Sequence, residues 1–473
     1  MTVRPFKLAF CPIGKFVFSH EDALRQKQAI RGVLERLAVD YVDLETVLPD
    51  GMVRDQKHVE PVVEHFRGRH VDGLFIPHCN FGTEGAAGEI ARRLEVPTLL
   101  WGPRDEAPLP DGTRLRDSLC GLLATSKVLV KLGVTFTYLP NCRVDDPEFA
   151  EGLDAFVRAA CVANTLRRGC RIGMIGQRID FFWSTRVDHD ELRRRFNIEV
   201  VTFDLPGFIE SCRERARSQA GGYEKEAKEL GRRWIIEDMS PQALINVLAV
   251  RDQTLAICEA SGLDACTCES FMSLPEAMGA WTMAADSMIS ETVPFAMESD
   301  VCGAVSTLLL ARADMGRSPA WLVDLCARHP TDDNAVLVWH AGAPVSMKHP
   351  DDGVRLGKHW VLPGPLSGMT HFRLKDGPMT CARFDGDQGR YALAVGEGES
   401  CEGPFTLNNY VWMRVRHWPN WERNLIEGPF LHHIGMTYGR YARVLKEAAR
   451  YVPGLALVDL DAEPKDNLRS ATP

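Results

Sequence analysis

The chain has 473 residues, of which 45% are hydrophobic and 25% are charged, and its formal net charge at pH 7 is -9. These values are typical of a water-soluble globular protein with two or three domains. The negative charge argues against nucleic acid or an anionic membrane as a partner, because neither would be attracted to it.

Cellular location is predicted from three features. Residues 1–16 carry only a short apolar run, without the cleavage site of a secretory signal, and no later run reaches transmembrane length. The fourteen cysteines are scattered without a C-x-x-C pair, so we expect reduced thiols. The close pair Cys266 and Cys268 is interpreted as a buried strand end rather than a metal site. Together these features favour a cytoplasmic protein.

The first domain is expected to span residues 1–166. Its sequence predicts strands at 7–12, 41–44, 73–77 and within 96–101, alternating with helices at 21–37, 53–67, from Glu84 onward and within 116–133. Strands that alternate with helices of this length indicate a doubly wound parallel sheet.

Two loops of this domain follow predicted strands, at the edge where such sheets bind ligands. They carry Asn80, Trp101 and Arg104, and a Trp beside an Arg could stack on a sugar and donate hydrogen bonds to it. Neither loop has a G-x-G-x-x-G or P-loop pattern, so nucleotide binding has little support. The alternatives are a polar loop that caps a helix through Thr83 and, for Trp101, a subunit interface.

A second doubly wound domain is expected at 167–314 and a β-rich domain at 315–473. In the second domain, a strand precedes Gly176, a helix follows Asp188, and a charged helical segment at 209–233 is expected to break at 221–222. From residue 333 onward, short apolar runs separated by Gly, Pro, Asp and Asn predict antiparallel strands. Helical periodicity returns only at 438–451, which predicts a terminal helix.

Three acids stand at the ends of apolar runs. Glu298 and Asp300 precede a predicted helix at 301–312, and Asp324 ends the next apolar run. Asp300 fits an N-cap, whose side chain accepts backbone N–H bonds. Glu298 and Asp324 lie where open sheets place working residues, and the two could flank one metal ion or one substrate, although ordinary caps and loop acids are the simpler alternative.

An imidazole could complete this set. His432 and His433 are expected in a Gly-punctuated loop before the last helix, where a histidine pair is more often structural. Two carboxylates and one imidazole, with positions left open for oxygen ligands, would suit a hard divalent cation such as Mn²⁺.

At these residues the chain resembles the L-fucose isomerase and L-arabinose isomerase family. The matching segments are 296–305 (AMESDVCGAV), 318–324 (SPAWLVD), 419–421 (PNW) with 433–439 (HIGMTYG), and 339–344 (WHAGAP). The resemblance implies that Glu298, Asp324 and His433 bind Mn²⁺. It also implies aldose–ketose isomerisation through a cis-enediol, with Glu298 and Asp324 as general base and acid.

The resemblance implies a homo-oligomer, a hexamer in this family, in which the first domain of one subunit helps to cover the active site of another. Asn80, Trp101 and Arg104 would then line the sugar site in trans, and His432 would contact the sugar. The chain has His432 where fucose isomerases tend to have Asn, and it is short for a fucose isomerase.

Two other function classes are compatible with these residues. One is a sugar-binding protein that performs no chemistry. The other is a metal-dependent epimerase or aldolase that uses the same enediolate and differs only in its product. The expected substrate is a free hexose or pentose, and the residues do not distinguish a methyl, hydroxymethyl or charged group at C6.

Overall fold

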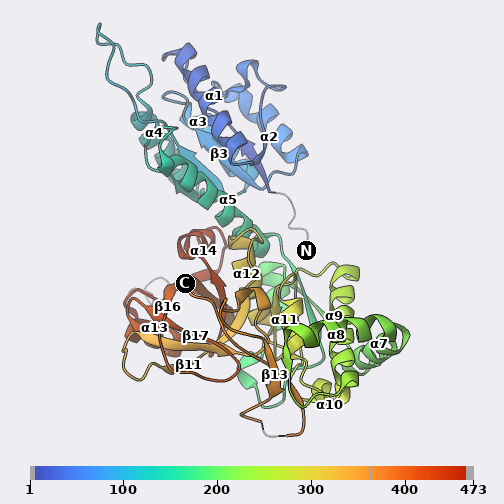
Figure 1. Cartoon of the computed structure of the whole chain (residues 1–473). Coiled ribbons are helices and arrows are strands. Elements are labelled where there is room, and N and C mark those ends of the chain that lie inside the picture. The colour runs from blue at the N-terminus through green and yellow to red at the C-terminus, as the bar shows by residue number, and fades with distance from the viewer. Residues whose placement is uncertain (1–5, 363, 465–473) are drawn as a thin grey trace. The chain divides into compact units, whose positions relative to one another are not determined.

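The computed structural model of the chain describes residues 6–362 and 364–464 (Figure 1). The chain forms two compact units, which meet between Asn164 and Thr165. None of the described helices is both long and apolar enough to cross a membrane.

The first unit is built on a parallel sheet, as the sequence predicts, and the sheet has a fifth strand that was not expected. Its strand order is β2-β1-β3-β4-β5. The strands are β1 (Lys7–Phe10), β2 (Asp40–Val42), β3 (Gly73–Pro77), β4 (Thr98–Trp101) and β5 (Phe136–Tyr138). The helices are α1 (His20–Arg36), α2 (Val59–Gly68), α3 (Glu84–Leu94), α4 (Ser118–Lys131) and α5 (Pro147–Arg167), with short 3-10 turns at Pro49–Gly51 and Gln56–His58.

Apolar side chains cover both faces of this sheet because alternate residues of a strand point to opposite sides. Leu74 and Ile76 of β3 pack in one core with α2, α3 and α4. Phe75, between them, faces the other side and packs against Phe149 of α5 at a ring-centroid distance of 6.2 Å. The first unit therefore has helices on both sides of its sheet.

The second unit begins with a parallel α/β part. Its strands β6 (Arg171–Ile175), β7 (Glu199–Phe203), β9 (Ala265–Cys268) and β10 (Phe295–Ala296) pair in the order β7-β6-β9-β10, and β8 (Ile235–Ile236) lies at the far edge of the same sheet. The helices are α6 (His189–Phe196), α7 (Leu205–Ser218), α8 (Ala220–Arg233), α9 (Pro241–Ala260), α10 (Ser273–Met278), α11 (Met283–Ile289) and α12 (Val301–Ala313), with a 3-10 turn at Trp183–Thr185. The charged segment breaks at Gln219, between α7 and α8, and not at the expected glycines.

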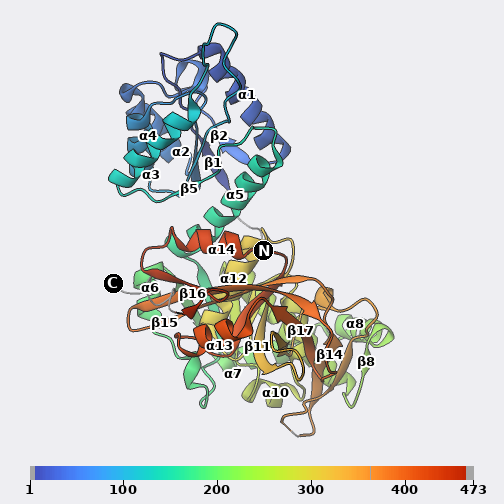
Figure 2. The ribbon, with the colours of Figure 1, turned by 90° about the vertical axis from the view of Figure 1, so that its left-hand side faces the viewer.

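The C-terminal part is β-rich, as expected (Figure 2). Its strands are β11 (Trp321–Arg328), β12 (Ala335–His340), β13 (Arg355–Lys358), β14 (Ser367–Arg373), β15 (Pro378–Asp387), β16 (Arg390–Cys401), β17 (Asn409–Val415), β18 (His433–Tyr438) and β19 (Leu455–Asp459). It also contains α13 (Trp418–Ile426), α14 (Ala442–Ala449) and a 3-10 turn at Val345–Met347.

Six of these strands close on themselves. Antiparallel pairs connect β11 to β18, β18 to β15, β15 to β16, β16 to β17, β17 to β12, and β12 back to β11. We call this closed set the six-stranded ring. Trp321, Val338, Met413 and Ile434 belong to its apolar core. Closure pairs both edges of every one of these strands, which fixes their register.

Strand β11 joins the ring to the parallel part. It pairs with β10 in parallel through Phe295 and Trp321, and with β18 in the antiparallel direction. The expected domain boundary at 314/315 therefore falls between α12 and β11, inside one compact unit whose two halves share a sheet.

The segment before the last helix corrects one expectation. His433 does not lie in a loop but is the first residue of β18, and the strand continues to Tyr438. The terminal helix α14 consequently begins at Ala442, four residues after the start expected from periodicity. Strand pairing with β11 and β15 explains the difference, because these contacts join residues far apart in the sequence.

Candidate active site

Glu298 is presented by a short loop between β10 and α12. Glu298 and Ser299 both have left-handed backbone conformations, with φ of 65° and 55°. Such conformations cost about 1–3 kcal/mol each for residues other than glycine and persist only where the surroundings enforce them. Here the N–H of Ser299 donates to the carbonyl of Cys268 at 3.1 Å, and its hydroxyl donates to the carbonyl of Gln177 at 2.9 Å. The ends of two neighbouring parallel strands thus hold the loop.

Three further side chains come from the six-stranded ring. Asp324 of β11 is paired in register with His433 of β18 on one side and with Trp339 of β12 on the other. His340 is the last residue of β12. A sheet places paired residues close together on the same face, which brings Asp324 and His433 together although more than 100 residues separate them in the sequence.

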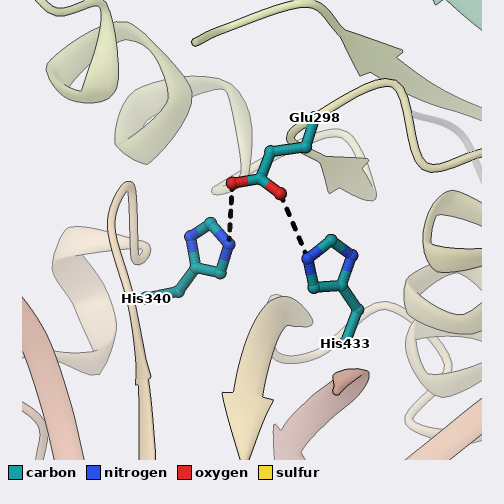
Figure 3. Close-up of side chains that lie close together, drawn as sticks. All are labelled: Glu298, His340 and His433. Atoms are coloured by element: carbon teal, nitrogen blue, oxygen red, sulfur yellow. Dashed lines mark ion pairs between the residues drawn. The ribbon is translucent and has the colours of Figure 1, made fainter. Parts of the chain in front are cut away.

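Four side chains converge at this point, and Figure 3 shows three of them, Glu298, His340 and His433. His433 Nε2 lies 3.1 Å from Glu298 Oε2 and 3.6 Å from Asp324 Oδ1. His340 Nε2 lies 3.8 Å from Glu298 Oε1 and 3.9 Å from Asp324 Oδ1. Glu298, His340 and His433 are buried, whereas Asp324 is partly open to solvent. Two carboxylates and two imidazoles therefore share one largely enclosed space.

The other ring nitrogen of His433 is fixed by Asp300. His433 Nδ1 lies 2.9 Å from Asp300 Oδ2. Asp300 also accepts the N–H of Gly303 at 2.8 Å, which confirms the expected N-cap of α12. An ionised carboxylate only accepts hydrogen bonds, so the shared proton sits on Nδ1 and the ring can offer Nε2 to a metal ion.

Charge and hydrogen bonding shift the pKa values of this group. Burial alone would lower the pKa of His433, but hydrogen bonds to Asp300 and Glu298 outweigh burial and raise that pKa to about 10. Burial would raise the pKa of Glu298, yet its bond to His433 and the nearby imidazoles bring that pKa below its usual value. Burial opposes ionisation of Asp300 as well, but Arg383 and His433 prevail and lower its pKa. Both acids are therefore ionised at neutral pH.

His340 differs from His433 in its tautomer. Its Nδ1 accepts the backbone N–H of Ala341 at 2.9 Å. In a neutral imidazole one nitrogen accepts and the other donates, so the proton of His340 lies on Nε2, which faces Glu298 and Asp324. His340 is thus set up to donate a hydrogen bond into the site.

Several side chains around the site were not assigned from the sequence. Phe182 lies edge-on to His433 at a centroid distance of 6.3 Å. His359 is buried between Phe271 and Trp281, and its pKa is lowered to about 4 by burial and by the charge of His340. Their sequence context gave no signal, because each stands in an irregular loop whose partners are distant along the chain.

The expected sugar contacts occupy different environments. His432 lies beside the site, with Nε2 3.9 Å from Asp324 Oδ1 and a half-exposed side chain. Arg104 is exposed in the first unit. Asn80 is buried, and its Oδ1 accepts the N–H groups of Lys15 and Gly82 at 2.7 and 3.2 Å.

Trp101 belongs to the core of the first unit instead of a ligand surface. It is fully buried, and its ring centroid lies 4.3 Å from that of Phe149. Packing of this kind leaves no ring face on which a sugar could stack. The apolar run predicts a strand that ends near Trp101, and the same apolar character explains why Trp101 is buried in the core.

The donor atoms fit a divalent cation. Within the described residues, two groups of side chains could hold a metal ion: Glu298 with His340 and His433, and Asp324 with His432 and His433. Glu298 Oε2 and Asp324 Oδ1 are buried carboxylate oxygens that both face Nε2 of His433, at 3.1 and 3.6 Å. Carboxylate oxygens and an imidazole nitrogen that converge in this way are the kinds of atoms that can bind a divalent cation.

Comparison with known proteins gives a consistent assignment. Residues 11–167 match the family described as Fucose/sulfoquinovose isomerase, N-terminal domain. The chain is 26% identical over 381 residues to the sulfoquinovose isomerase of Alkalicoccus urumqiensis, covering 78% of this chain and 82% of that protein.

Two solved structures are remotely similar to the chain. A periplasmic solute binding protein of an ABC transporter from Actinobacillus succinogenes 130z, with bound D-allose, aligns with a TM-score of 0.17 and 13% identity over 66% of this chain and 93% of its own. The glycosyltransferase SnogD from Streptomyces nogalater aligns with a TM-score of 0.13 and 12% identity over 65% of this chain and 85% of its own. Neither value supports a structural argument.

The N-terminal match and the relative that spans most of the chain agree with the resemblance carried by the segments around Glu298, Asp324 and His433. The chain is similar to the fucose isomerase-like family in its N-terminal domain and to one sulfoquinovose isomerase over most of its length.

Proposed function

We propose that the protein is a metal-dependent isomerase that interconverts an aldose and a ketose through a cis-enediol. The observation that carries this proposal is the convergence of Glu298, Asp324 and His433 on one point, where Glu298 Oε2 and Asp324 Oδ1 lie 3.1 and 3.6 Å from His433 Nε2. We propose that these three residues bind Mn²⁺, because two carboxylates and one imidazole suit a hard cation that keeps open positions for oxygen ligands.

The bound ion would supply positive charge next to the carbonyl oxygen of the open-chain sugar, which lowers the energy of the enediolate. The protons on carbon are moved by the protein. In the aldose-to-ketose direction, Glu298 takes the proton from C2, and the C–H electron pair becomes the C1–C2 double bond. The proton of the C2 hydroxyl moves to the C1 oxygen, and the electron pair of the C1–C2 double bond takes a proton at C1 from the protonated carboxyl of Asp324. Glu298 and Asp324 then exchange protons with solvent, so that Glu298 is again ionised and Asp324 again protonated.

Glu298 suits the role of base because its lowered pKa keeps it ionised at neutral pH. His340, with its proton on Nε2, is placed to donate a hydrogen bond to a sugar oxygen during this transfer. Burial of the site strengthens both effects, since charges and dipoles act more strongly where water is excluded.

We propose sulfoquinovose, a hexose with a sulfonate at C6, as the substrate, because the relative that aligns with most of the chain is named for this activity. Fucose and arabinose remain the comparison substrates. We further propose that the protein works in the cytoplasm as a homo-oligomer, in which His432 contacts the sugar of its own subunit and Arg104 lines the sugar site of another subunit.

The test follows the C2 proton. Metal-stripped protein is incubated in D₂O with sulfoquinovose, glucose, fucose or arabinose, with and without Mn²⁺, and exchange at C2 is followed by NMR together with the products. We expect exchange and ketose formation that require Mn²⁺ and are fastest with sulfoquinovose. Glu298→Gln should lower the rate by at least about 100-fold, the usual scale for loss of a general base.

Glu291→Gln is the matched control, because Glu291 accepts hydrogen bonds from Ser346 away from the site. Exchange without ketose formation would identify an epimerase, and a three-carbon fragment would identify an aldolase. Metal-independent exchange, or full activity of Glu298→Gln, would overturn the proposal.

A further inference from the structure

Arg383 of β15 forms a second layer behind the candidate metal site. Its guanidinium makes two contacts with the carboxylate of Asp300, Nη1 to Oδ2 at 2.5 Å and Nη2 to Oδ1 at 3.1 Å. Asp300 in turn holds Nδ1 of His433. Arg383, Asp300 and His433 are each about 1% exposed. A continuous chain of charged hydrogen bonds therefore runs from β15 through the start of α12 to β18.

A second carboxylate holds the far side of Arg383. Asp385 Oδ2 lies 2.8 Å from Nε of Arg383 and 2.6 Å from Nη2. Asp385 itself accepts the N–H of Gly386 at 2.8 Å. The guanidinium is thus clamped between two acids, and a planar fork with five donors can make such contacts on two sides at once, which an ammonium group cannot.

We propose that Arg383 is a positioning residue for the metal: it holds Asp300 in the orientation that keeps the proton of His433 on Nδ1 and directs Nε2 at Glu298 and Asp324. This inference rests on the proposed function, since it assigns Arg383 a role in metal binding. Arg383 itself touches neither the metal ligands Glu298 and Asp324 nor the place where a sugar would react.

The two contacts of Asp300 explain why it needs the positive charge of Arg383 beside it. Asp300 has to cap α12 through Gly303 and orient His433 at the same time, which uses both of its oxygens. If the N–H of Gly303 and Nδ1 of His433 were its only partners, ionising this buried carboxylate would cost much free energy. Arg383 supplies the compensating charge and fills the remaining acceptor positions of both oxygens, so Asp300 stays ionised and cannot rotate.

The experiment measures Mn²⁺ affinity directly, by competition with a chelator and by the electron paramagnetic resonance signal of free Mn²⁺, on metal-stripped full-length protein without sugar. Arg383→Lys keeps the charge but loses the two-pronged contact. We expect its dissociation constant for Mn²⁺ to rise about 10-fold, and that of Asp300→Asn about 10- to 100-fold, the range typical of residues that orient metal ligands.

A matched control separates positioning from general stability. The hydroxyl of Ser306 accepts the N–H of Phe384, next to Arg383, without touching Asp300 or His433. Ser306→Ala should lower the melting temperature and leave Mn²⁺ affinity unchanged. In Arg383→Lys, excess Mn²⁺ should restore the turnover rate to within about 3-fold of the original protein, because the defect lies in metal binding.

The outcomes are distinguishable from failure of the proposed function. If the unmodified protein binds no Mn²⁺, the proposed function fails first. If it binds Mn²⁺ and Arg383→Lys binds equally well, the role of Arg383 is overturned. Should Arg383→Lys fail to fold, Asp385→Asn loosens the guanidinium without touching Asp300, and an unchanged Mn²⁺ affinity in that variant would equally overturn the inference.

Discussion

Asp324 and His433 lie directly opposite each other on neighbouring antiparallel strands, β11 and β18, with Asp324 Oδ1 3.6 Å from His433 Nε2. Two residues locked in this way cannot move apart unless the strands separate. We therefore expect a metal ion bound there to lose much of its affinity when either side chain is changed.

Asp324→Asn tests this expectation. The amide keeps the size of the carboxylate but removes its charge, so Mn²⁺ affinity should fall at least about 10-fold and turnover about 100-fold or more. Thermal unfolding gives an independent readout, because an ion at 100 times its dissociation constant stabilises the folded state by about 2.7 kcal/mol. The variant should lose this Mn²⁺-dependent rise in melting temperature, whereas Asp387→Asn, at an exposed position of β15, should keep it. An unchanged rise in Asp324→Asn would remove Asp324 from the ligand set.

His340→Gln separates hydrogen-bond donation from metal binding. Because Nδ1 of His340 accepts the N–H of Ala341, the proton lies on Nε2 and that nitrogen has no lone pair for a metal ion. We expect Mn²⁺ affinity to change by less than about 3-fold while the turnover rate falls by about 10- to 100-fold. A large loss of Mn²⁺ affinity would instead make His340 a ligand, with its proton moved to Nδ1.

Gly342 is the position where the turn after His340 tolerates no larger side chain. Its φ is 70°, and an added Cβ would lie 3.0 Å from Cβ of Asp286 and 3.3 Å from Cε of Met297. Gly342→Ala should lower the free energy of unfolding by about 1–3 kcal/mol, through backbone strain and crowding. Urea denaturation measures the loss. Gly353→Ala, where nothing lies within 4 Å and φ is not left-handed, should be nearly neutral. Equal stability of the two variants would contradict the argument.

Asp286 makes the stability of the protein depend on pH. This carboxyl is buried in α11, Oδ2 has no hydrogen-bond partner, and burial raises its pKa to about 8. Since the pKa is near 4 in the unfolded chain, the folded state binds the extra proton between about pH 4 and 8, and the protein loses stability as pH rises through that window. An acid in an ion pair has a lowered pKa, so its contribution to stability changes with pH in the opposite direction.

Asp286→Asn removes this titration. Between pH 5 and 7, the stability of the original protein relative to the variant should fall by up to about 1.4 kcal/mol per pH unit. Urea midpoints of both proteins at pH 5, 6 and 7 measure this difference in stability. The contributions of other groups cancel, because they titrate in both proteins. A difference independent of pH would show that Asp286 is ionised when folded.

Short-range signals in the sequence predicted much of the fold and part of the site. The helix expected at 301–312 is α12, Val301–Ala313, and Asp300 caps it as its position suggested. The strand expected at 73–77 is β3. Capping and alternation are local rules that a single segment can reveal. The motifs around Glu298, Asp324 and His433 also identified side chains that the fold brings together.

Long-range pairing could not be predicted in the same way. Arg383 stands in an ordinary strand segment, and its partner Asp300 is 83 residues away, so nothing local marks it as part of a metal site. The start of β18 at His433 depends on pairing with β11, which no window of the sequence displays. Trp101 is a second example. The local sequence at a strand end is the same whether the side chain faces solvent or packs against a helix such as α5.

Closure of the six-stranded ring has a consequence for how the enzyme could change over evolution. Asp324, His340 and His433 lie on ring strands whose register cannot slip, whereas the exposed side chains of Trp183 and Trp360 lie outside the ring, in a short 3-10 turn and a loop. Loops tolerate substitution and insertion far better than paired strands. The chemical step can therefore be inherited unchanged while the loops are remodelled, so that relatives with different sugar preferences would differ in their loops and share their strands.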